Sequence, residues 1–329
     1  MTGSGLQAGE KNKFMEKRKL GKSDLEFAPL ALGGNVFGWT IDQAASFKIL
    51  DAFAGAGFDF IDTADVYSRW APGNTGGESE TILGEWMKER ANRDKIIIAT
   101  KVGADMGLGH KDLTKKYILK AAEDSLLRLQ TDYIDLYQTH WDDDITPVEE
   151  TLEAYAQLVK DGKVKWIGAS NLSPERFKKS LGVSKKHGYP SYQSFQPLYN
   201  LYDRQDYEKE IEPICLENNI GVITYYSLAS GFLTGKYRSE NDLDKSKRGG
   251  GIKKYLNERG FRILHALDEV SKQYHTNQAA IALAWAISRK SITAPIASAT
   301  TVEQLNELIK ATGIRLDEAA IDLLNKASS

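Results

Sequence analysis

Two acids and a tyrosine directly follow an apolar run near the start of the chain, in GFDFIDTADVY (residues 57–67). Tyr67 carries a phenol, whose unperturbed pKa of about 10 makes it a poor acid at neutral pH. A neighbouring cation favours the phenolate and lowers that pKa. Asp62, which ends the apolar run, could orient such a cation. The stretch therefore predicts proton transfer with Tyr67 as the acid.

Two more polar residues close apolar runs further along the chain. Lys101 ends IIIATK (96–101) and His140 ends IDLYQTH (134–140). Each residue alone has a plain structural explanation. A histidine at a strand end is more often a hydrogen-bonded structural residue than a catalytic one, and a lysine is usually solvated. A lysine behind four apolar residues is nevertheless costly to place without a carboxylate. Together the residues predict that Lys101, oriented by Asp62, tunes Tyr67, while His140 polarises a substrate carbonyl.

This set of side chains contains no activated nucleophile. General acid catalysis typically contributes about 10²–10⁴ in rate, so the rest must come from a carbon-centred reaction partner, and a hydride donor fits. A lyase or isomerase would instead need a metal cage or a Schiff-base lysine in an apolar pocket. Lys101 beside Asp62 is a poor candidate for the latter, and we predict no metal site.

Short β-type runs that alternate with longer amphipathic runs must position these residues. The helical patterns include ESETILGEWMKER (78–90) and PVEETLEAYAQLVKDGK (147–163). This alternation favours a (β/α)₈ TIM barrel, in which the carboxyl ends of all strands meet at one mouth. A doubly wound sheet is the main alternative, but no GxGxxG turn follows the first strand. The eight expected strands are residues 31–32, 58–62, 95–102, 134–140, 164–170, 192–197, 221–227 and 292–298.

Two segments lie outside this repeat. Residues 15–30 are expected to form a β-hairpin with its turn at Gly21 to Asp24, which would plug the bottom of the barrel. A long, polar, Gly- and Lys-rich stretch follows the seventh strand, and we call residues 231–255 the lid segment. Its length and composition predict a mobile lid.

Composition excludes several classes of protein. A formal net charge of -2 offers no general attraction for nucleic acid or an acidic membrane. The single cysteine, Cys215, excludes an internal disulfide and a Cys-based zinc cluster and favours a reducing compartment. No run approaches the roughly 18 apolar residues of a spanning helix. We expect a cytoplasmic protein, with residues 1–14 as a flexible leader or cloning remnant and residues 15–329 as one domain.

From about Met15 onward the chain resembles the aldo-keto reductase family, particularly its bacterial-type members that are similar to potassium-channel beta subunits and general-stress reductases. The resemblance rests on the spaced tetrad Asp62, Tyr67, Lys101 and His140, and on KWIGASN (165–171), FQPLYNL (195–201), YYSLASGFLTGKY (225–237) and APIASATTVEQLNE (294–307). It implies the same barrel and hydride transfer between NAD(P)H and an aldehyde or ketone. It also implies that Tyr67 protonates the carbonyl oxygen while His140 orients the substrate.

The resemblance further implies a set of cofactor-binding residues. Ser170, Asn171 and Gln196 match positions that bind the nicotinamide carboxamide, and Tyr226 matches the aromatic residue that stacks on the ring. Lys245, Lys247 and Arg248 add positive charge to the lid segment. The other expected cofactor contacts are Gly34, Asn35, Asp62, Ser227, Leu228, Gly231, Lys236, Ser298, Thr300, Gln304 and Glu307.

The adenosine end departs from the commonest family pattern. Thr300 and Glu303 form a capping-box pattern at a helix start, where an anion is physically expected. Many members place an arginine against the 2′-phosphate, whereas this chain has Gln304, and Glu307 adds a negative charge. We predict NADP(H) ahead of NAD(H), with NAD(H) use kept open.

The substrate pocket is expected to be aromatic. Phe37, Trp39, Trp70 and Trp141 lie near the predicted mouth, where they could contact an apolar group or stack on a sugar, or simply pack a loop. Three acids follow Trp141 and disfavour an anionic substrate. A neutral aldehyde or ketone, or a sugar or polyol, is the expected substrate. A cofactor-binding regulatory subunit with slow turnover stays the alternative to an enzyme.

Overall fold

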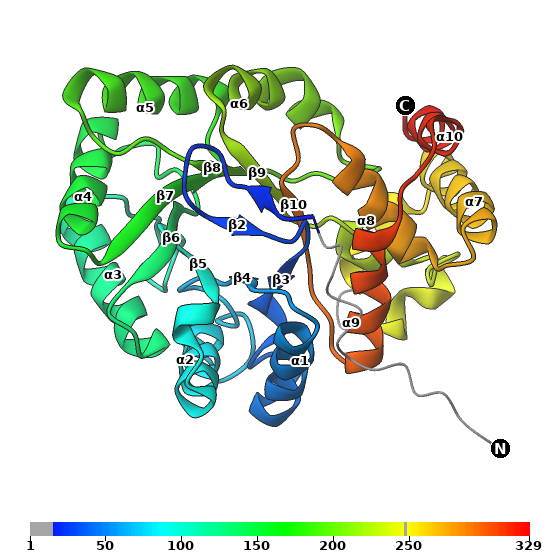
Figure 1. Ribbon diagram of the computed structural model, residues 1–329, viewed down its shortest axis with the longest axis horizontal. Helices are drawn as coiled ribbons and strands as arrows, with labels where there is room; N and C mark the ends of the chain where they lie inside the picture. The colour runs from blue at the N-terminus through cyan, green and yellow to red at the C-terminus, as the bar shows by residue number, and fades with distance from the viewer. Residues whose placement is uncertain (1–15, 247–248) are drawn as a thin grey trace.

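The protein is described by a computed structural model that covers residues 16–246 and 249–329. The expected leader at residues 1–14 and the lid cations Lys247 and Arg248 lie outside the described residues. Eight parallel strands close into a barrel in the order β10-β3-β4-β5-β6-β7-β8-β9 (Figure 1). This confirms the predicted TIM barrel. The barrel strands are β3 Ala31–Gly33, β4 Phe60–Asp62, β5 Ile97–Val102, β6 Ile134–Thr139, β7 Val164–Ser170, β8 Ser194–Gln196, β9 Gly221–Thr224 and β10 Ala294–Ala297.

Helices surround the barrel and follow its strands, as Figure 1 shows. Several of them begin at a polar residue whose side chain accepts from a backbone N–H of the first turn, including Asp42, Thr114, Ser173 and Asn277. Pro213, which has no N–H, lies at the start of α6, directly after a π-helical turn at Tyr207–Ile211. The surrounding helices are α1 Gln43–Gly55, α2 Glu78–Arg90, α3 Lys115–Leu129, α4 Val148–Lys160, α5 Pro174–His187, α6 Glu212–Asn218, α8 Gln278–Ser288 and α9 Val302–Ile309.

The predicted hairpin is present at one end of the barrel. Strands β1 (Arg18–Lys19) and β2 (Glu26–Phe27) pair antiparallel, and the ribbon crosses the barrel end in Figure 1. Leu20 and Phe27 are buried against the apolar residues inside the barrel, and the Phe27 ring lies 4.2 Å from that of Phe60. The hairpin thus closes the amino-terminal end with apolar side chains.

Two further helices pack on each other beside the barrel. They are α7 (Glu258–Gln273) and α10 (Glu318–Ser328), drawn in gold and red in Figure 1. Arg259 ties them together by donating to the backbone oxygen of Ser328. Within the described residues, no helix has both the length and the apolar character needed to cross a bilayer.

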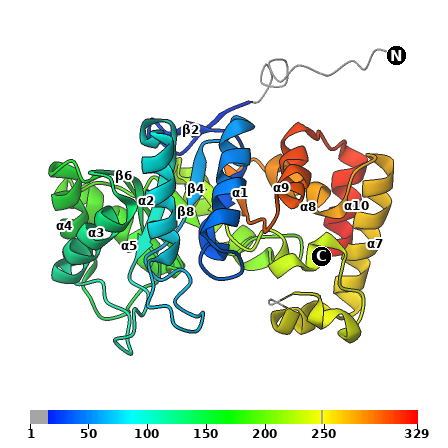
Figure 2. The ribbon, with the colours of Figure 1, turned by 90° about the horizontal axis from the view of Figure 1, so that it is seen from below.

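The segment between β9 and α7 forms a series of short 3₁₀ turns. Figure 2 shows it at the end of the barrel opposite the hairpin, the same end at which the loops after β4 and β5 project. The expected strand at 221–227 stops at Thr224, because Tyr226 adopts a left-handed backbone conformation with φ 50°. The turns are Ala229–Thr234, Glu240–Lys245, Gly249–Gly251 and Lys253–Tyr255.

Candidate active site

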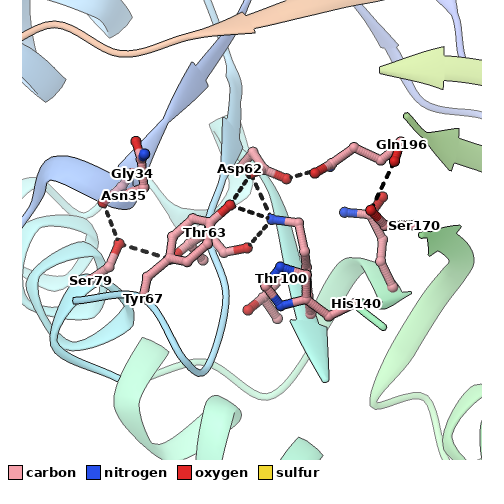
Figure 3. Close-up of polar contacts among 12 residues, drawn as sticks. Gly34, Asn35, Asp62, Thr63, Tyr67, Ser79, Thr100, His140, Ser170 and Gln196 are labelled. Atoms are coloured by element: carbon pink, nitrogen blue, oxygen red, sulfur yellow. Dashed lines mark hydrogen bonds and ion pairs between the residues drawn. The ribbon is translucent and has the colours of Figure 1, made fainter. Parts of the chain in front are cut away.

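Side chains alternate along each barrel strand, and this alternation carries polar groups into the mouth. Ala99 and Leu136 lie in the apolar interior of the barrel. Lys101 follows Ala99 by two residues, and His140 follows Leu136 by four, so both point to the same side of their strands as these interior residues. Figure 3 shows Asp62, Tyr67 and His140 gathered at this place. The structure thus brings the predicted tetrad together.

Asp62 and Lys101 form a buried ion pair. Lys101 Nζ lies 2.7 Å from Asp62 Oδ2 and also donates to the backbone oxygen of Thr63 at 2.7 Å. Burial lowers the pKa of Lys101, and the Asp62 carboxylate opposes that shift. The pair is therefore what allows a charged lysine to remain inside the barrel.

Tyr67 lies directly against this ion pair. Lys101 Nζ donates to the Tyr67 hydroxyl oxygen at 3.0 Å, and the hydroxyl donates to Asp62 Oδ2 at 3.2 Å. The ammonium group also lies 4.6 Å from the centre of the Tyr67 ring. The contact with the ammonium group favours the phenolate form, because a cation touches the oxygen that would carry the negative charge, whereas the bond to the Asp62 carboxylate favours the neutral phenol.

The imidazole of His140 faces the Tyr67 ring across the mouth. The ring centroids are 6.1 Å apart, at an interplanar angle of 71°. Burial, with a further contribution from the nearby Lys101 cation, lowers the pKa of His140 well below its usual range. The imidazole is therefore neutral at physiological pH. Its Nδ1 atom is buried and has no hydrogen-bond partner among residues 16–246 and 249–329.

Amide and hydroxyl side chains extend the site along β7 and β8. Gln196 donates to Asp62 Oδ1 at 2.8 Å, and Ser170 Oγ donates to the Gln196 backbone oxygen at 2.8 Å (Figure 3). Asn171 donates to the backbone oxygen of His140 and to Ser170 Oγ, both at 2.9 Å. Its carbonyl accepts from the Tyr225 hydroxyl at 2.8 Å. Asn171 therefore links His140, Ser170 and Tyr225.

Tyr226 presents an exposed ring next to these polar groups. Tyr226 is 51% exposed to solvent, and its ring centroid lies 5.4 Å from that of Tyr225. The backbone turns sharply here, since Ala229 and Ser230 also adopt positive φ values. A bulky residue in this conformation is uncommon and needs support from its surroundings.

The residues after Tyr226 differ in accessibility. Ser227 is buried and donates to the Thr224 backbone oxygen at 2.9 Å, whereas Leu228 is half-buried against the core. Gly231 has φ 100°, and a Cβ there would lie 3.8 Å from Lys236 Nζ. The turn thus brings the Lys236 cation to the glycine. Lys245, which was also expected to add positive charge, is engaged within the lid segment by Asp242 and the Lys236 backbone oxygen.

The helix that follows β10, α9, begins one residue later than the sequence predicts. The N-cap of α9 is Thr301, whose side chain accepts from the Gln304 backbone N–H at 3.2 Å, so the Thr300–Glu303 capping pair is wrong. Adjacent threonines offered two start positions, and the second one is used. Gln304 Oε1 instead accepts from the backbone N–H and hydroxyl of Thr300, at 3.0 and 2.9 Å. Glu307 pairs with Lys310 at 2.5 Å and accepts from Asn277.

The first strand of the barrel places the remaining expected contacts beside β10. Ser298 Oγ donates to Asn35 Oδ1 at 2.7 Å. A Cβ at Gly33 would lie 2.5 Å from Ser298 Oγ and 2.9 Å from Ile296 Cγ2, so a larger residue would have to displace both side chains. Gly34 is buried, and its backbone oxygen accepts from Ser79 at 2.9 Å.

The four aromatic residues expected at the substrate pocket divide into two groups. Trp70 and Trp141 are 49% and 43% exposed, and Trp39 packs edge-on against Trp70 at 5.5 Å. Trp70 in turn contacts the Tyr67 ring at 6.0 Å, and His140 contacts Trp141 at 6.2 Å. Phe37 differs from the expectation, because it is fully buried in the hydrophobic core and offers no surface to a ligand.

Sequence reasoning missed several residues that support the site. Ser79, at the start of α2, bonds both Thr63 and Gly34 (Figure 3). Tyr225 holds Asn171, and buried Asn200 donates to the Tyr226 backbone oxygen at 3.0 Å. Tyr225 follows interior Ile223 by two residues, so alternation along β9 could have identified it. Ser79 and Asn200 carry no comparable signal, because their partners come from distant segments.

The donor set fits a nicotinamide dinucleotide. The exposed ring of Tyr226 packs against Tyr225, whose hydroxyl bonds the Asn171 amide. A ring that carries a carboxamide requires such a stacking surface together with groups that both donate and accept. Gly231 in a left-handed turn allows close approach of backbone, and Lys236 lies next to it. The described residues therefore combine a stacking surface, an amide cluster and a cationic turn at one end of the barrel.

Comparison with known proteins supports the same conclusion. A model of the aldo/keto reductase family matches residues 29–329. The chain is 35% identical to uncharacterized oxidoreductase YrpG of Bacillus subtilis (strain 168), covering 94% of this chain and 95% of that protein. It is 33% identical to aldo-keto reductase YhdN of the same organism, with 87% and 84% covered. It is 30% identical to a probable voltage-gated potassium channel subunit beta of Oryza sativa subsp. japonica, with 91% and 92% covered.

The match spans almost all of the barrel and includes every strand from β3 to β10. It agrees with the geometry of the mouth, where an Asp–Lys ion pair contacts a tyrosine hydroxyl opposite a neutral histidine. The chain belongs to the aldo/keto reductase family and is an oxidoreductase by this relationship.

Proposed function

We propose that this chain interconverts a neutral aldehyde or ketone and the corresponding alcohol, with a nicotinamide dinucleotide as redox partner and Tyr67 as general acid and base. One observation carries the proposal: the Tyr67 hydroxyl lies 3.0 Å from Lys101 Nζ, which itself is held 2.7 Å from Asp62. This is the arrangement that makes a tyrosine acidic enough to act near neutral pH.

Each member of the tetrad has one part in the proposed reaction. Tyr67 gives its proton to the carbonyl oxygen, and the Lys101 cation stabilises the phenolate that remains. Asp62 keeps Lys101 charged within the barrel. Neutral His140 donates a hydrogen bond to the same carbonyl oxygen and so orients the substrate. When bound, a reduced nicotinamide supplies the hydride that the carbonyl carbon accepts.

The dinucleotide is proposed to extend from the amide cluster to α9. Tyr226 would stack on the nicotinamide, with Gln196 and Ser170 near its carboxamide. Gly231 and Lys236 would face the pyrophosphate, and Ser298, Thr300 and Gln304 the adenosine end. We propose NADP(H) ahead of NAD(H), because the α9 amino terminus and the amide N–H groups of Gln304, which folds back onto Thr300, favour an additional phosphate. The pairing of Glu307 with Lys310 reduces the repulsion that Glu307 alone would exert.

The substrate is proposed to be neutral and at least partly apolar. The rings of Trp39, Trp70 and Trp141 border the Tyr67 and His140 rings and offer flat surfaces. Two of the acids after Trp141 are engaged elsewhere. Asp142 is paired with Arg176 at 2.9 Å, and Asp143 accepts from the backbone of Leu113 and Thr146.

A regulatory subunit that binds the dinucleotide but turns it over slowly is the second candidate. Its support is the 30% identity to a protein named as a probable channel beta subunit. Turnover separates the two proposals. Rapid oxidation of NADPH with a panel of small aldehydes, measured at 340 nm, supports the enzyme. Tight NADPH binding with turnover near the buffer rate supports the regulatory subunit, and absence of binding of NADPH and NADH rejects both.

A further inference from the structure

A buried asparagine in the loop after β8 bonds to two separate parts of the site. Asn200 Oδ1 accepts from the backbone N–H groups of Tyr202 and Asp203, at 2.8 and 2.9 Å. Its Nδ2 donates to Asp203 Oδ2 at 3.1 Å and to the Tyr226 backbone oxygen at 3.0 Å. An amide side chain offers two N–H groups and two acceptor positions, and all four are used here.

The bond to Tyr226 acts on a strained peptide. Tyr226 has φ 50°, and the Ala229 N–H also donates to its backbone oxygen, at 2.7 Å. For a bulky aromatic residue this conformation costs energy that its surroundings must offset. Asn200 holds the carbonyl of that same residue. The direction of the exposed Tyr226 ring therefore depends on the position of Asn200.

Asp203, the partner of Asn200, receives the carboxyl-terminal end of the lid segment. The Tyr255 hydroxyl donates to Asp203 Oδ2 at 2.8 Å, and Lys254 Nζ lies 3.9 Å from Oδ1. The fully buried Tyr255 ring stacks on Phe232, at the other end of the lid segment, with centroids 5.2 Å apart. Both ends of the lid segment therefore meet at Tyr255, and one hydroxyl joins them to Asp203.

The loop that carries Asn200 and Asp203 is itself fixed to the C-terminal helix. Arg204 donates to Asn325 at 2.9 Å and to Ser328 at 2.8 Å on α10, and pairs with Glu208 at 2.8 Å. Its guanidinium also lies 4.9 Å from the Trp285 ring. This anchoring makes the loop a fixed reference to which the lid segment attaches.

We propose that Asn200 and Asp203 are a positioning pair that closes the lid segment through Tyr255 and simultaneously orients Tyr226. The proposal rests on the proposed function, in which Tyr226 is the surface for the nicotinamide ring. Because one amide–carboxylate bond serves both contacts, opening of the lid segment and reorientation of Tyr226 are coupled. Coupling of this kind is reciprocal, so binding at Tyr226 also favours lid closure.

The first test needs no dinucleotide. Tyr255→Phe removes the hydroxyl that reaches Asp203 and retains the ring that stacks on Phe232. Tyr237→Phe is the matched control, because Tyr237 is also a fully buried lid tyrosine, but its hydroxyl bonds Ser246 within the lid segment at 2.6 Å. We expect the Ala229 amide, which bonds the Tyr226 oxygen, to exchange with solvent about tenfold faster in Tyr255→Phe and no faster in Tyr237→Phe. Unchanged exchange at Ala229 in Tyr255→Phe would overturn the coupling.

The second test measures dinucleotide affinity by quenching of protein fluorescence. Tyr255→Phe and Asn200→Asp should each weaken binding about tenfold, the factor that about 1.4 kcal/mol represents. Asn200→Asp keeps the acceptors for the turn but loses the donor to Tyr226. If Tyr237→Phe weakens binding as much as Tyr255→Phe, the proposed pair has no special role. If the unsubstituted protein binds neither NADPH nor NADH, the proposed function fails, whereas the exchange test at Ala229 still decides the coupling.

A double variant that exchanges Asn200 and Asp203 separates the contact with Tyr226 from the contact with Tyr255. In the double variant Asn200→Asp with Asp203→Asn, the amide and carboxylate change places, so their mutual bond and an acceptor for Tyr255 survive. The donor to the Tyr226 oxygen is absent. We expect lid amides near Tyr255 to regain the exchange rates of the unsubstituted protein, while dinucleotide binding stays about tenfold weaker. Full recovery of affinity would contradict the role assigned to Asn200.

Discussion

Gln196 donates its side-chain amide to Asp62 Oδ1 at 2.8 Å, while the other oxygen of that carboxylate accepts from Lys101 at 2.7 Å. A single carboxylate thus connects the expected carboxamide contact with the acid–base pair. The two functions of the site, binding the dinucleotide and tuning Tyr67, are therefore expected to change together when this amide is lost.

Gln196→Ala tests that connection. It removes a hydrogen bond to a charged group, which is typically worth about 1.5–3 kcal/mol, and it also removes a proposed carboxamide contact. We expect kcat and dinucleotide affinity both to fall at least tenfold. Gln138→Ala is the control, because Gln138 is another fully buried glutamine of the barrel, and its carbonyl accepts from Ser194 at 3.4 Å. Weaker binding with unchanged kcat in Gln196→Ala would mean that the amide does not influence Asp62.

Asp65, the second acid of the opening motif, gives a prediction about pH. Both its carboxylate oxygens are buried without a hydrogen-bond partner in the described part of the chain, and burial beside Glu80 raises its pKa well above the usual range. A carboxyl group that stays protonated in the folded protein but ionises in the unfolded chain lowers the free energy of unfolding as the pH rises above its unfolded pKa. Asp65→Asn removes this cost. Urea unfolding should therefore show the variant gaining stability relative to the unsubstituted protein between pH 5 and pH 8.

The expected gain is up to about 1.4 kcal/mol per pH unit. Asp59→Asn is a suitable control for the loss of a carboxylate, because Asp59 is partly exposed and pairs with Lys17 at 2.8 Å. A difference between variant and unsubstituted protein that stays constant from pH 5 to pH 8 would show that Asp65 is ionised in the folded state.

Replacement of two helical glycines by alanine is expected to change the free energy of unfolding in opposite directions. A Cβ at Gly84 on α2 would lie 2.2 Å from the Arg128 backbone oxygen of α3, whereas a Cβ at Gly182 on α5 would meet no atom within 4 Å. Gly84→Ala should lower the free energy of unfolding by about 1–3 kcal/mol. Gly182→Ala should raise it by about 0.5–1 kcal/mol through helix propensity. Chemical denaturation measures both, and equal effects would contradict the close packing of α2 on α3.

The preference between dinucleotides depends on the start of α9. Gln304 folds back onto Thr300, so its amide N–H groups are the donors left for a 2′-phosphate. We expect kcat/KM for NADPH to exceed that for NADH by on the order of tenfold. Gln304→Arg should widen the ratio, since a guanidinium binds phosphate bidentately. Gln304→Lys controls for charge without the fork, and an unchanged ratio in both variants would show that the phosphate lies elsewhere.

Much of the barrel could be predicted because buried parallel strands appear as short apolar runs between turn residues. The expected strand at 164–170 coincides with β7, and the hairpin turn lies where Gly21 to Asp24 placed it. The pairing of α7 with α10 could not be predicted, because each is an ordinary amphipathic helix and only tertiary packing selects the partner. The end of β9 was missed because the Tyr226 conformation is imposed by distant contacts.

The site shows the same division. Asp62, Lys101 and His140 end apolar runs, and strand alternation brings such residues to one mouth, so their proximity could be inferred. Phe37 also lies beside the first strand, but it is fully buried in a core cluster whose members come from the whole length of the barrel, so its burial follows from tertiary packing. The N-cap of α9 is Thr301 and not Thr300. The sequence could not distinguish these two adjacent threonines, because they differ only in backbone geometry.

Replacement of Tyr67 by Phe tests the central claim most directly. The change removes the hydroxyl that contacts Lys101 and Asp62 and keeps the ring that packs against Trp70 and His140. The measurement is single-turnover reduction of one aldehyde, with NADPH affinity measured in parallel by fluorescence. The account predicts that the reduction rate falls by about 10²–10⁴ while NADPH affinity changes less than threefold. A variant that reduces the aldehyde at the rate of the unsubstituted protein would contradict the assignment of Tyr67 as the proton donor.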